Sequence, residues 1–182
     1  QNGDRLSAQY NHSFEYLPRP FAVAAGVTLP VRDYAFDDVQ VSFLFTQQRR
    51  LSGTLALQAG EFYDGTIRSI AFTGGRFEFT RQFSIEPSTT LNWVELPAGG
   101  FATRLVGSRV TFTMTPRMFA SGLVQYNSST STFSANVRLR WEYRPGSDFF
   151  VVYSEGRDTT TGTKTPMQNR GLVVKMTRLF RF

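Results

Sequence analysis

Hydrophobic and polar residues alternate along much of this chain, and the alternation is clearest between Phe133 and Arg144. There the odd positions are apolar and the even positions are polar or charged, over about twice the length of an average strand. A period of two indicates a β-strand with one apolar and one polar face. Because the charged face needs water and the aromatic face needs an apolar neighbour, the pattern predicts the wall of a transmembrane β-barrel.

Similar alternation predicts the other strands of an all-β fold. They are expected at residues 5–17, 39–46, 52–62, 66–79, 83–95, 106–115, 119–127, 148–157 and 169–182. We therefore predict that residues 1–182 form a single domain, a closed up-and-down antiparallel barrel of about ten strands. Pairing of the first strand with the last would close it. Gly74 and Gly75 predict a bulge, because the apolar face switches from Phe72 to Phe77.

The segment 18–37 is predicted as a long extracellular loop. Its apolar residues alternate weakly, but Pro18, Pro20 and Pro30 disfavour strands embedded in a sheet. The loop is expected to fold over the barrel mouth or its wall. The alternative is a strand pair here, which would give a barrel of about twelve strands.

The connections are predicted to alternate in length. Tight turns are expected near residues 48–51, 80–82, 115–118 and 145–148, and mostly longer connections near 18–37, 62–66, 96–101, 127–132 and 157–168. Bacterial outer-membrane barrels have short periplasmic turns and longer outer loops. Both termini are therefore expected on the periplasmic side.

The two faces of the predicted strands give two sets of functional residues. Those expected to face the lumen, as pore or plug, are Glu15, Arg76, Glu78, Arg109, Arg138, Arg140, Glu142, Arg144 and Lys175. Those expected to face lipid or its interface are Phe133, Val137, Leu139, Trp141, Tyr143, Leu172, Val174, Phe180 and Phe182. The first set makes a positively charged lumen, in which carboxylates pair with some of the arginines.

Composition agrees with a barrel and excludes several classes of site. Aromatic residues make up 15% of the chain although its mean hydropathy is only −0.24, and no apolar run is long enough for a transmembrane helix. Cysteine is absent and His12 is the single histidine, which removes thiolate sites and most zinc sites. The net charge of +6 is spread over single arginines without a phosphate loop, so we expect no nucleic-acid partner.

The residues that could support catalysis or metal binding have simpler interpretations. His12 lies among outward aromatic residues and is interpreted as an interfacial polar residue. Glycoside hydrolysis needs two suitably spaced carboxylates, and Glu15, Glu78, Glu142 and Glu155 are better interpreted as ion-pair partners. Aspartates in turns usually cap their own backbone, which argues against calcium at Asp33, Asp37, Asp38 or Asp64. We expect no enzyme activity, no catalytic residue, no cofactor and no metal.

Several stretches resemble a known family. They are residues 139–158, 172–182, 48–53, 60–65 and 123–127. Together they resemble the C-terminal outer-membrane barrel of an uncharacterised bacterial family, in which a family-9-like carbohydrate-binding module precedes the barrel. The resemblance implies a Gram-negative outer membrane and a chain without that sugar-binding module. Some members are labelled hydrolases, but no hydrolase motif occurs here.

The predicted function is that of an outer-membrane anchor or narrow porin-like channel, linked to carbohydrate or small-solute handling. The expected partners are membrane lipid and lipopolysaccharide, an envelope protein, and the outer-membrane insertion machinery, which would read a last strand ending at Phe182. Residues 1–5 do not open a signal peptide, so we expect either a cleaved precursor or the C-terminal part of a longer one. The alternatives are a soluble ligand-binding β-barrel or sandwich, and a fragment of a wider porin or transporter barrel.

Overall fold

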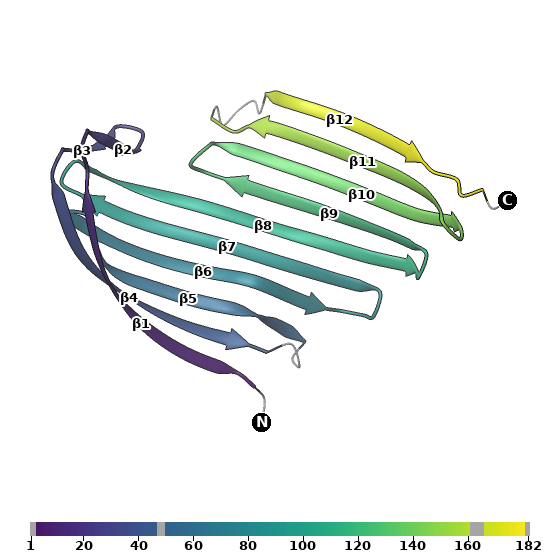
Figure 1. The fold of residues 1–182 in the computed structure, drawn as a ribbon, viewed down its shortest axis with the longest axis horizontal. Helices are drawn as coiled ribbons and strands as arrows, with labels where there is room; N and C mark the ends of the chain where they lie inside the picture. The colour runs from purple at the N-terminus through teal and green to yellow at the C-terminus, as the bar shows by residue number, and fades with distance from the viewer. Residues whose placement is uncertain (1–2, 47–49, 161–165, 181–182) are drawn as a thin grey trace. The chain divides into compact units, whose positions relative to one another are not determined.

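The computed structural model describes residues 3–46, 50–160 and 166–180, and shows an all-β chain (Figure 1). Its strands are β1 (Arg5–Tyr16), β2 (Phe21–Ala24), β3 (Val27–Leu29), β4 (Asp33–Phe45), β5 (Leu51–Phe62), β6 (Gly65–Glu78), β7 (Phe83–Leu96), β8 (Gly99–Thr115), β9 (Met118–Asn127), β10 (Thr132–Arg144), β11 (Ser147–Asp158) and β12 (Met167–Met176). Within these ranges no helix is long and apolar enough to cross a membrane.

Ten strands form one sheet in the order β1-β4-β5-β6-β7-β8-β9-β10-β11-β12, while β2 and β3 form a separate pair. Within the sheet, β4 pairs antiparallel with β1 and β5, β10 pairs antiparallel with β9 and β11, and β11 pairs antiparallel with β12. The predicted all-β class and the succession of ten strands are thus confirmed. Among the described residues no hydrogen bonding pairs β1 with β12, so the sheet is not closed in this way.

The chain forms two compact units. One contains Gln1–Gly74 and Ser88–Leu105, and the other contains Gly75–Pro87 and Val106–Phe182. The strands β6, β7 and β8 contribute one end to each unit.

In the first unit, β1 and β4 pair along their whole length, with Arg5 opposite Leu44 and Tyr16 opposite Asp33. Directly opposite residues share a face of the sheet. One face therefore carries apolar pairs such as Leu6 with Phe43 and Ala8 with Val41. The other carries polar pairs, as the alternation predicted.

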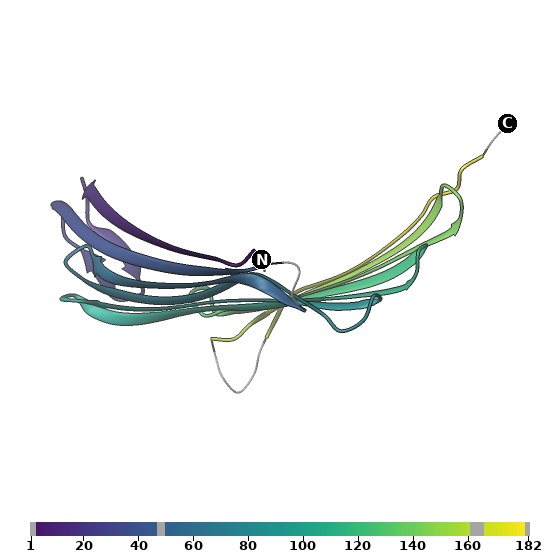
Figure 2. The same ribbon diagram turned by 90° about the horizontal axis from the view of Figure 1, so that it is seen from below.

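A small hydrophobic core lies at the end of this unit where β1 ends and β4 begins. Its buried members are Leu17, Val27, Leu29, Tyr34, Val94 and Leu96. Tyr34 lies opposite Glu15, so the core covers the predicted lumen face. Figure 2 shows the β2–β3 hairpin on the inner side of the curved strands of this unit. The hairpin supplies Val27 and Leu29 to the core.

The prediction of a loop over residues 18–37 was incomplete, because this segment contains β2, β3 and the start of β4. The three prolines lie outside β2 and β3 and do not interrupt them. They do not prevent a short strand pair, because such a pair needs only a few backbone hydrogen bonds. The pair does not join the ten-stranded sheet, so the segment adds strands without widening that sheet.

In the second unit, β10 pairs with β9 on one side and β11 on the other, and β11 pairs with β12. Pro145 and Gly146 form the turn between β10 and β11. Gly146 has a φ of 75°, which suits the third position of a type II turn after proline. The turn predicted near 145–148 is therefore confirmed.

The end of the last strand was predicted wrongly, since β12 stops at Met176 instead of continuing to the terminus. The backbone that follows β12 forms hydrogen bonds with the β10–β11 turn region. The Thr177 amide donates to the Asp148 carbonyl at 2.8 Å, and the Leu179 amide donates to the Ser147 hydroxyl at 3.0 Å. These bonds hold the chain at the turn, so Phe180 is not a strand residue, and Phe182 lies outside the described residues.

The predicted difference in connection length holds only in part. Tyr63–Asp64 and Pro97–Ala98 are tight turns, although both were predicted among the longer connections. Between β1 and β4, and between β11 and β12, the connections are longer. Gly74 has a φ of 61° inside β6, the left-handed conformation that glycine bulges use.

Candidate functional site

The polar face of the second unit gathers most of the predicted lumen residues. The register places Arg138 opposite Val152, Arg140 opposite Phe150, and Glu142 opposite Asp148. Lys175 lies opposite Phe150 on the other side of β11, so it shares this face. Arg144 follows a register irregularity and pairs with Ser147 at the end of β10.

Several of these charges neutralise one another. The Arg140 Nε is 3.1 Å from the Asp148 Oδ1, and the Arg76 guanidinium is 2.9 Å from Glu78 and 3.9 Å from Glu86. Glu142 instead accepts a bond from the Gly146 amide at 2.9 Å. The arginines predicted to face the lumen were expected to pair with carboxylates, and the structure shows such ion pairs for Arg76 and Arg140.

Two other arginines line one pocket of about 380 Å³. Arg109 comes from β8 and Arg138 from β10, and the lining is completed by Ser121, Leu123, Asn136 and Val152. Within the described ranges, no ion pair involves either guanidinium. The lining thus brings two arginines together without a carboxylate.

In the first unit, Glu15 lies at the edge of the buried core. The Tyr63 hydroxyl donates to the Glu15 Oε2 at 2.8 Å, and the Tyr63 ring packs edge-on against Tyr34 with centroids 5.0 Å apart. Burial, followed by the bond to Glu15, raises the pKa of Tyr63 to about 12. Glu15 is thereby a partner of the aromatic cluster.

The predicted lipid-facing residues of the second unit share the opposite face. The register aligns Val137 with Tyr153, Leu139 with Val151, and Trp141 with Phe149, while Leu172 and Val174 continue the same rows on β12. Phe133 lies opposite Arg157, where the apolar rows end. Tyr143 donates from its hydroxyl to the Thr177 carbonyl at 3.0 Å. This end of the apolar face is therefore tied to the C-terminal segment.

A histidine–aspartate pair on the apolar face of the first unit was not predicted. His12 lies opposite Asp37, and its Nδ1 is 2.6 Å from the Asp37 Oδ1. The Asp37 amide donates to Glu61 at 3.2 Å. Among the described residues, no serine or threonine hydroxyl that could serve as a nucleophile hydrogen-bonds to this pair. The interfacial role expected for His12 stays a prediction.

A second polar cluster interrupts the apolar face of the other unit. Glu155 accepts bonds from Tyr153 and Arg157, and the Arg170 Nη2 is 3.3 Å from its Oε2. The Glu155 side chain is 10% exposed. Sequence reasoning missed the cluster because Arg170 joins it only through the β11–β12 register. Both polar clusters lie near strand ends that lead into the longer connections.

The aspartates considered for calcium do not come together as a metal site. Asp64 pairs with Arg32 at 3.5 Å, and Asn11 donates to Asp38 at 3.0 Å. In the described part of the chain, no group of three or more histidine and carboxylate side chains is placed to hold a metal ion. The acidic residues act in local contacts.

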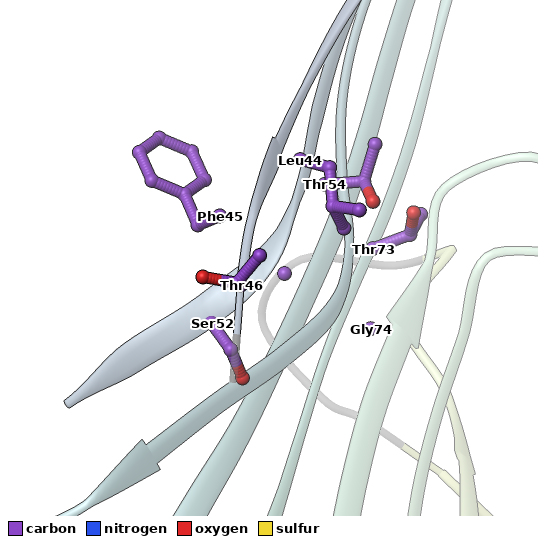
Figure 3. A pocket seen from close by; sticks show the side chains of 8 residues that line it. Leu44, Phe45, Thr46, Ser52, Thr54, Thr73 and Gly74 are labelled. Carbon is purple, nitrogen blue, oxygen red and sulfur yellow. The ribbon is translucent and has the colours of Figure 1, made fainter. Parts of the chain in front are cut away.

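A further pocket, of about 330 Å³, lies on the first unit (Figure 3). Hydroxyl-bearing and small residues line most of it, including Ser52, Thr54 and Thr73, while the Phe45 ring is turned away. Its lining contains no titratable side chain. It therefore lacks the acid and base groups that hydrolysis would need.

Models of known protein families, curated proteins and solved structures give no match to this chain.

Proposed function

We propose that this chain is an outer-membrane β-barrel protein of a Gram-negative bacterium, with periplasmic termini and no enzyme activity. It acts as a membrane anchor or as a narrow porin-like channel with a positively charged lumen. Its surroundings are membrane lipid and lipopolysaccharide, it is inserted by the outer-membrane insertion machinery, and an envelope protein is its expected partner. The family resemblance adds carbohydrates and other small solutes as the class of cargo.

The exposure of apolar side chains on one face of long strands carries this proposal. Leu6 is 68% exposed, Leu172 is 67% exposed and Val137 is 48% exposed. Soluble monomers rarely expose contiguous apolar surface of this kind. The opposite face carries paired and unpaired charges, which lipid would not tolerate. A barrel with lipid outside and water inside would give the apolar face and the charged face the surroundings that each requires.

Barrel closure follows from the backbone of the two edge strands. At the ends of the strand order, β1 and β12 would each leave a row of amides and carbonyls without partners. Such edges are not tolerated in the hydrocarbon region of a bilayer. Pairing β1 with β12 removes both edges, and ten strands make a barrel that is filled largely by side chains.

The hairpin supports a blocked or very narrow lumen. The β2–β3 pair covers the polar-side face of the first unit with a core in which Leu29 is fully buried and Tyr34 is 2% exposed. In a closed barrel this hairpin would lie in the mouth on the side of the longer connections. An anchor or a narrow channel therefore fits better than an open general porin.

The two polar clusters fit the headgroup zone of the same membrane. The His12–Asp37 pair, and Glu155 with its donors Tyr153, Arg157 and Arg170, interrupt the apolar face near strand ends. Amphipathic and charged groups are favourable at that depth, where headgroup phosphates and water are present. Arg157 and Arg170 would face the phosphates of lipopolysaccharide.

Membrane insertion can be tested directly. The full chain is refolded into phospholipid vesicles and examined for heat-modifiable migration, protease protection and ion conductance. We expect a protected, heat-modifiable monomer with little or no conductance. A chain that is soluble and monomeric without detergent would support the soluble alternative. An oligomer with large, sustained current would support a part of a wider porin.

A further inference from the structure

A basic pocket of the second unit is lined by Arg109 and Arg138. The pocket holds about 380 Å³ and is lined by those two arginines, two neutral polar residues and two aliphatic residues. All six belong to the second unit, so the site is complete within it. The counter-charge for its two guanidinium groups must come from neighbouring residues or from a ligand.

The neighbours of Arg138 do not supply that balance. Directly opposite it are Ser121 on β9 and Val152 on β11. The diagonal positions on the two neighbouring strands are also neutral, namely Phe119, Leu123, Phe150 and Ser154. Cross-strand and diagonal neighbours are the residues within reach on a sheet face. Arg138 therefore has no carboxylate in the positions where a sheet normally provides one.

Other arginines on the same face are different. Arg140 lies two residues along β10 and is held by Asp148 at 3.1 Å. Arg76 is held by Glu78 at 2.9 Å. Among the described residues, neither Arg109 nor Arg138 takes part in an ion pair. The face thus carries arginines that the protein neutralises, and the pocket brings together two that take part in no ion pair among the described residues.

We propose that Arg109 and Arg138 form a binding site for a small oxyanion, with a phosphate group as the preferred ligand. Guanidinium groups bind phosphate through paired, charge-assisted hydrogen bonds. Ser121 and Asn136 add a neutral hydroxyl and an amide to the same pocket. Asn136 already donates to Ser154 at 2.7 Å, which fixes its side chain. This inference rests on the proposed function in placing the site on the lumen wall.

The site would make a phosphate-bearing solute the preferred cargo or plug of the lumen. A phosphate held between two guanidiniums can exchange with water, because both arginines are exposed on the sheet face. Chloride would bind more weakly, since it offers no array of oxygen acceptors. We therefore expect selectivity for oxyanions over halides and not only for negative charge.

Phosphate binding is measured by isothermal titration on the full chain folded in detergent micelles, with inorganic phosphate and with chloride. The double variant Arg109→Gln, Arg138→Gln should weaken phosphate binding by at least about a hundredfold, since each charged hydrogen bond is worth about a factor of ten. The control is Arg81→Gln, Arg117→Gln, which removes the same charge from exposed turns. Arg138→Lys tests the bidentate geometry and should weaken phosphate binding while keeping the charge.

The outcomes separate the site from the membrane proposal. Equal phosphate affinity in the double variant and the control would overturn the site, even if the protein inserts into vesicles. Failure to insert into vesicles would overturn the proposed function, while phosphate binding in micelles could still depend on Arg109 and Arg138. If the double variant does not fold, Arg138→Lys and each single glutamine variant give the same comparison.

Discussion

The Tyr63 hydroxyl donates a hydrogen bond of 2.8 Å to Glu15, linking the β5–β6 turn to the end of β1. Tyr63 has a φ of 53°, an uncommon conformation for a residue with a side chain. Its ring contacts Tyr34 and Phe36 at centroid distances of 5.0 and 5.2 Å. The turn is therefore held in place by the aromatic cluster and by the bond to Glu15.

Tyr63→Phe should remove the hydrogen bond to Glu15 and one phenol whose pKa is raised. We expect a loss of about 0.5–1.5 kcal/mol of unfolding free energy, the usual value for one hydrogen bond. Because the pKa of Tyr63 is raised to about 12, its contribution is present below the ordinary tyrosine pKa of about 10 and is lost as pH rises from there to 12. Phenolate absorbance of the two proteins checks this. An unchanged titration curve between about pH 10 and 12 would contradict the assignment.

Alanine at position 65 should destabilise the first unit. An added Cβ at Gly65 would lie 1.9 Å from the Glu95 carbonyl oxygen, so the backbone of β6 or β7 must shift. We expect a cost of about 1–3 kcal/mol, as for overpacking, measured by urea unfolding of the refolded protein. Gly171→Ala is the control, because an added Cβ there meets nothing within 4 Å. Equal stability of the two variants would show that the strands do not approach in this way.

Truncating Leu29, which is fully buried in the core under the β2–β3 hairpin, should destabilise the first unit. Leu29→Ala removes side-chain volume that the core cannot refill, and should cost about 2–5 kcal/mol. Val31→Ala is the nearby control, since Val31 is 47% exposed. Urea unfolding measures the stability, and bilayer conductance shows whether a loosened hairpin opens the lumen. If both variants behave alike, the hairpin does not pack on this face.

A charge on the apolar face should prevent stable insertion. Val137→Arg should cost about 2–4 kcal/mol in vesicles if this residue faces the bilayer midplane. Ser134→Arg on the same strand, which lies on the polar face, should cost far less. Refolding yield and urea midpoint in vesicles give the comparison. A Val137→Arg protein that refolds better in water than the parent would instead favour a soluble fold.

Closure can be tested with engineered cysteines, because the native chain has none. A cysteine at Ala8 on β1 is combined with single cysteines along β12, at Leu172, Val174 and Met176. A disulfide needs Cα atoms within about 4–7 Å, so one pairing should form rapidly in a closed barrel. A cysteine at Ser121 on β9 is the control, as that strand pairs with β10 through most of its length. If no β12 position cross-links more than this control, the chain does not close on itself.

Local alternation was sufficient to predict the main strands, but not the contacts that depend on register. β10 was predicted to within one residue at its start, because its apolar and polar rows are uninterrupted. The His12–Asp37 contact depends on how β1 aligns with β4 across the intervening hairpin, and no local pattern contains that alignment. The same holds for Arg109 and Arg138, which come from strands separated by β9.

The errors arose where backbone bonding overruled a continuing pattern. Phe180 continues the apolar alternation of the last strand, yet the backbone amides of Thr177 and Leu179 donate hydrogen bonds to the β10–β11 turn region instead. Similarly, prolines beside residues 21–29 suggested a loop, although a pair as short as β2 and β3 can form between them. Both cases depend on a few specific hydrogen bonds or buried side chains, which the alternation of apolar and polar residues cannot predict.

The strand order has a consequence for how the chain assembles. From β4 to β12 every neighbour in the sheet is also the next strand in the chain, so each pairing closes only a short loop. Loops of this kind form quickly, whereas joining distant segments is slow. The sheet can therefore grow one hairpin at a time, and β1 can add after β4 has formed. Under the proposed closure, joining β1 to β12 is the step that spans the whole chain, so it should limit the rate of assembly.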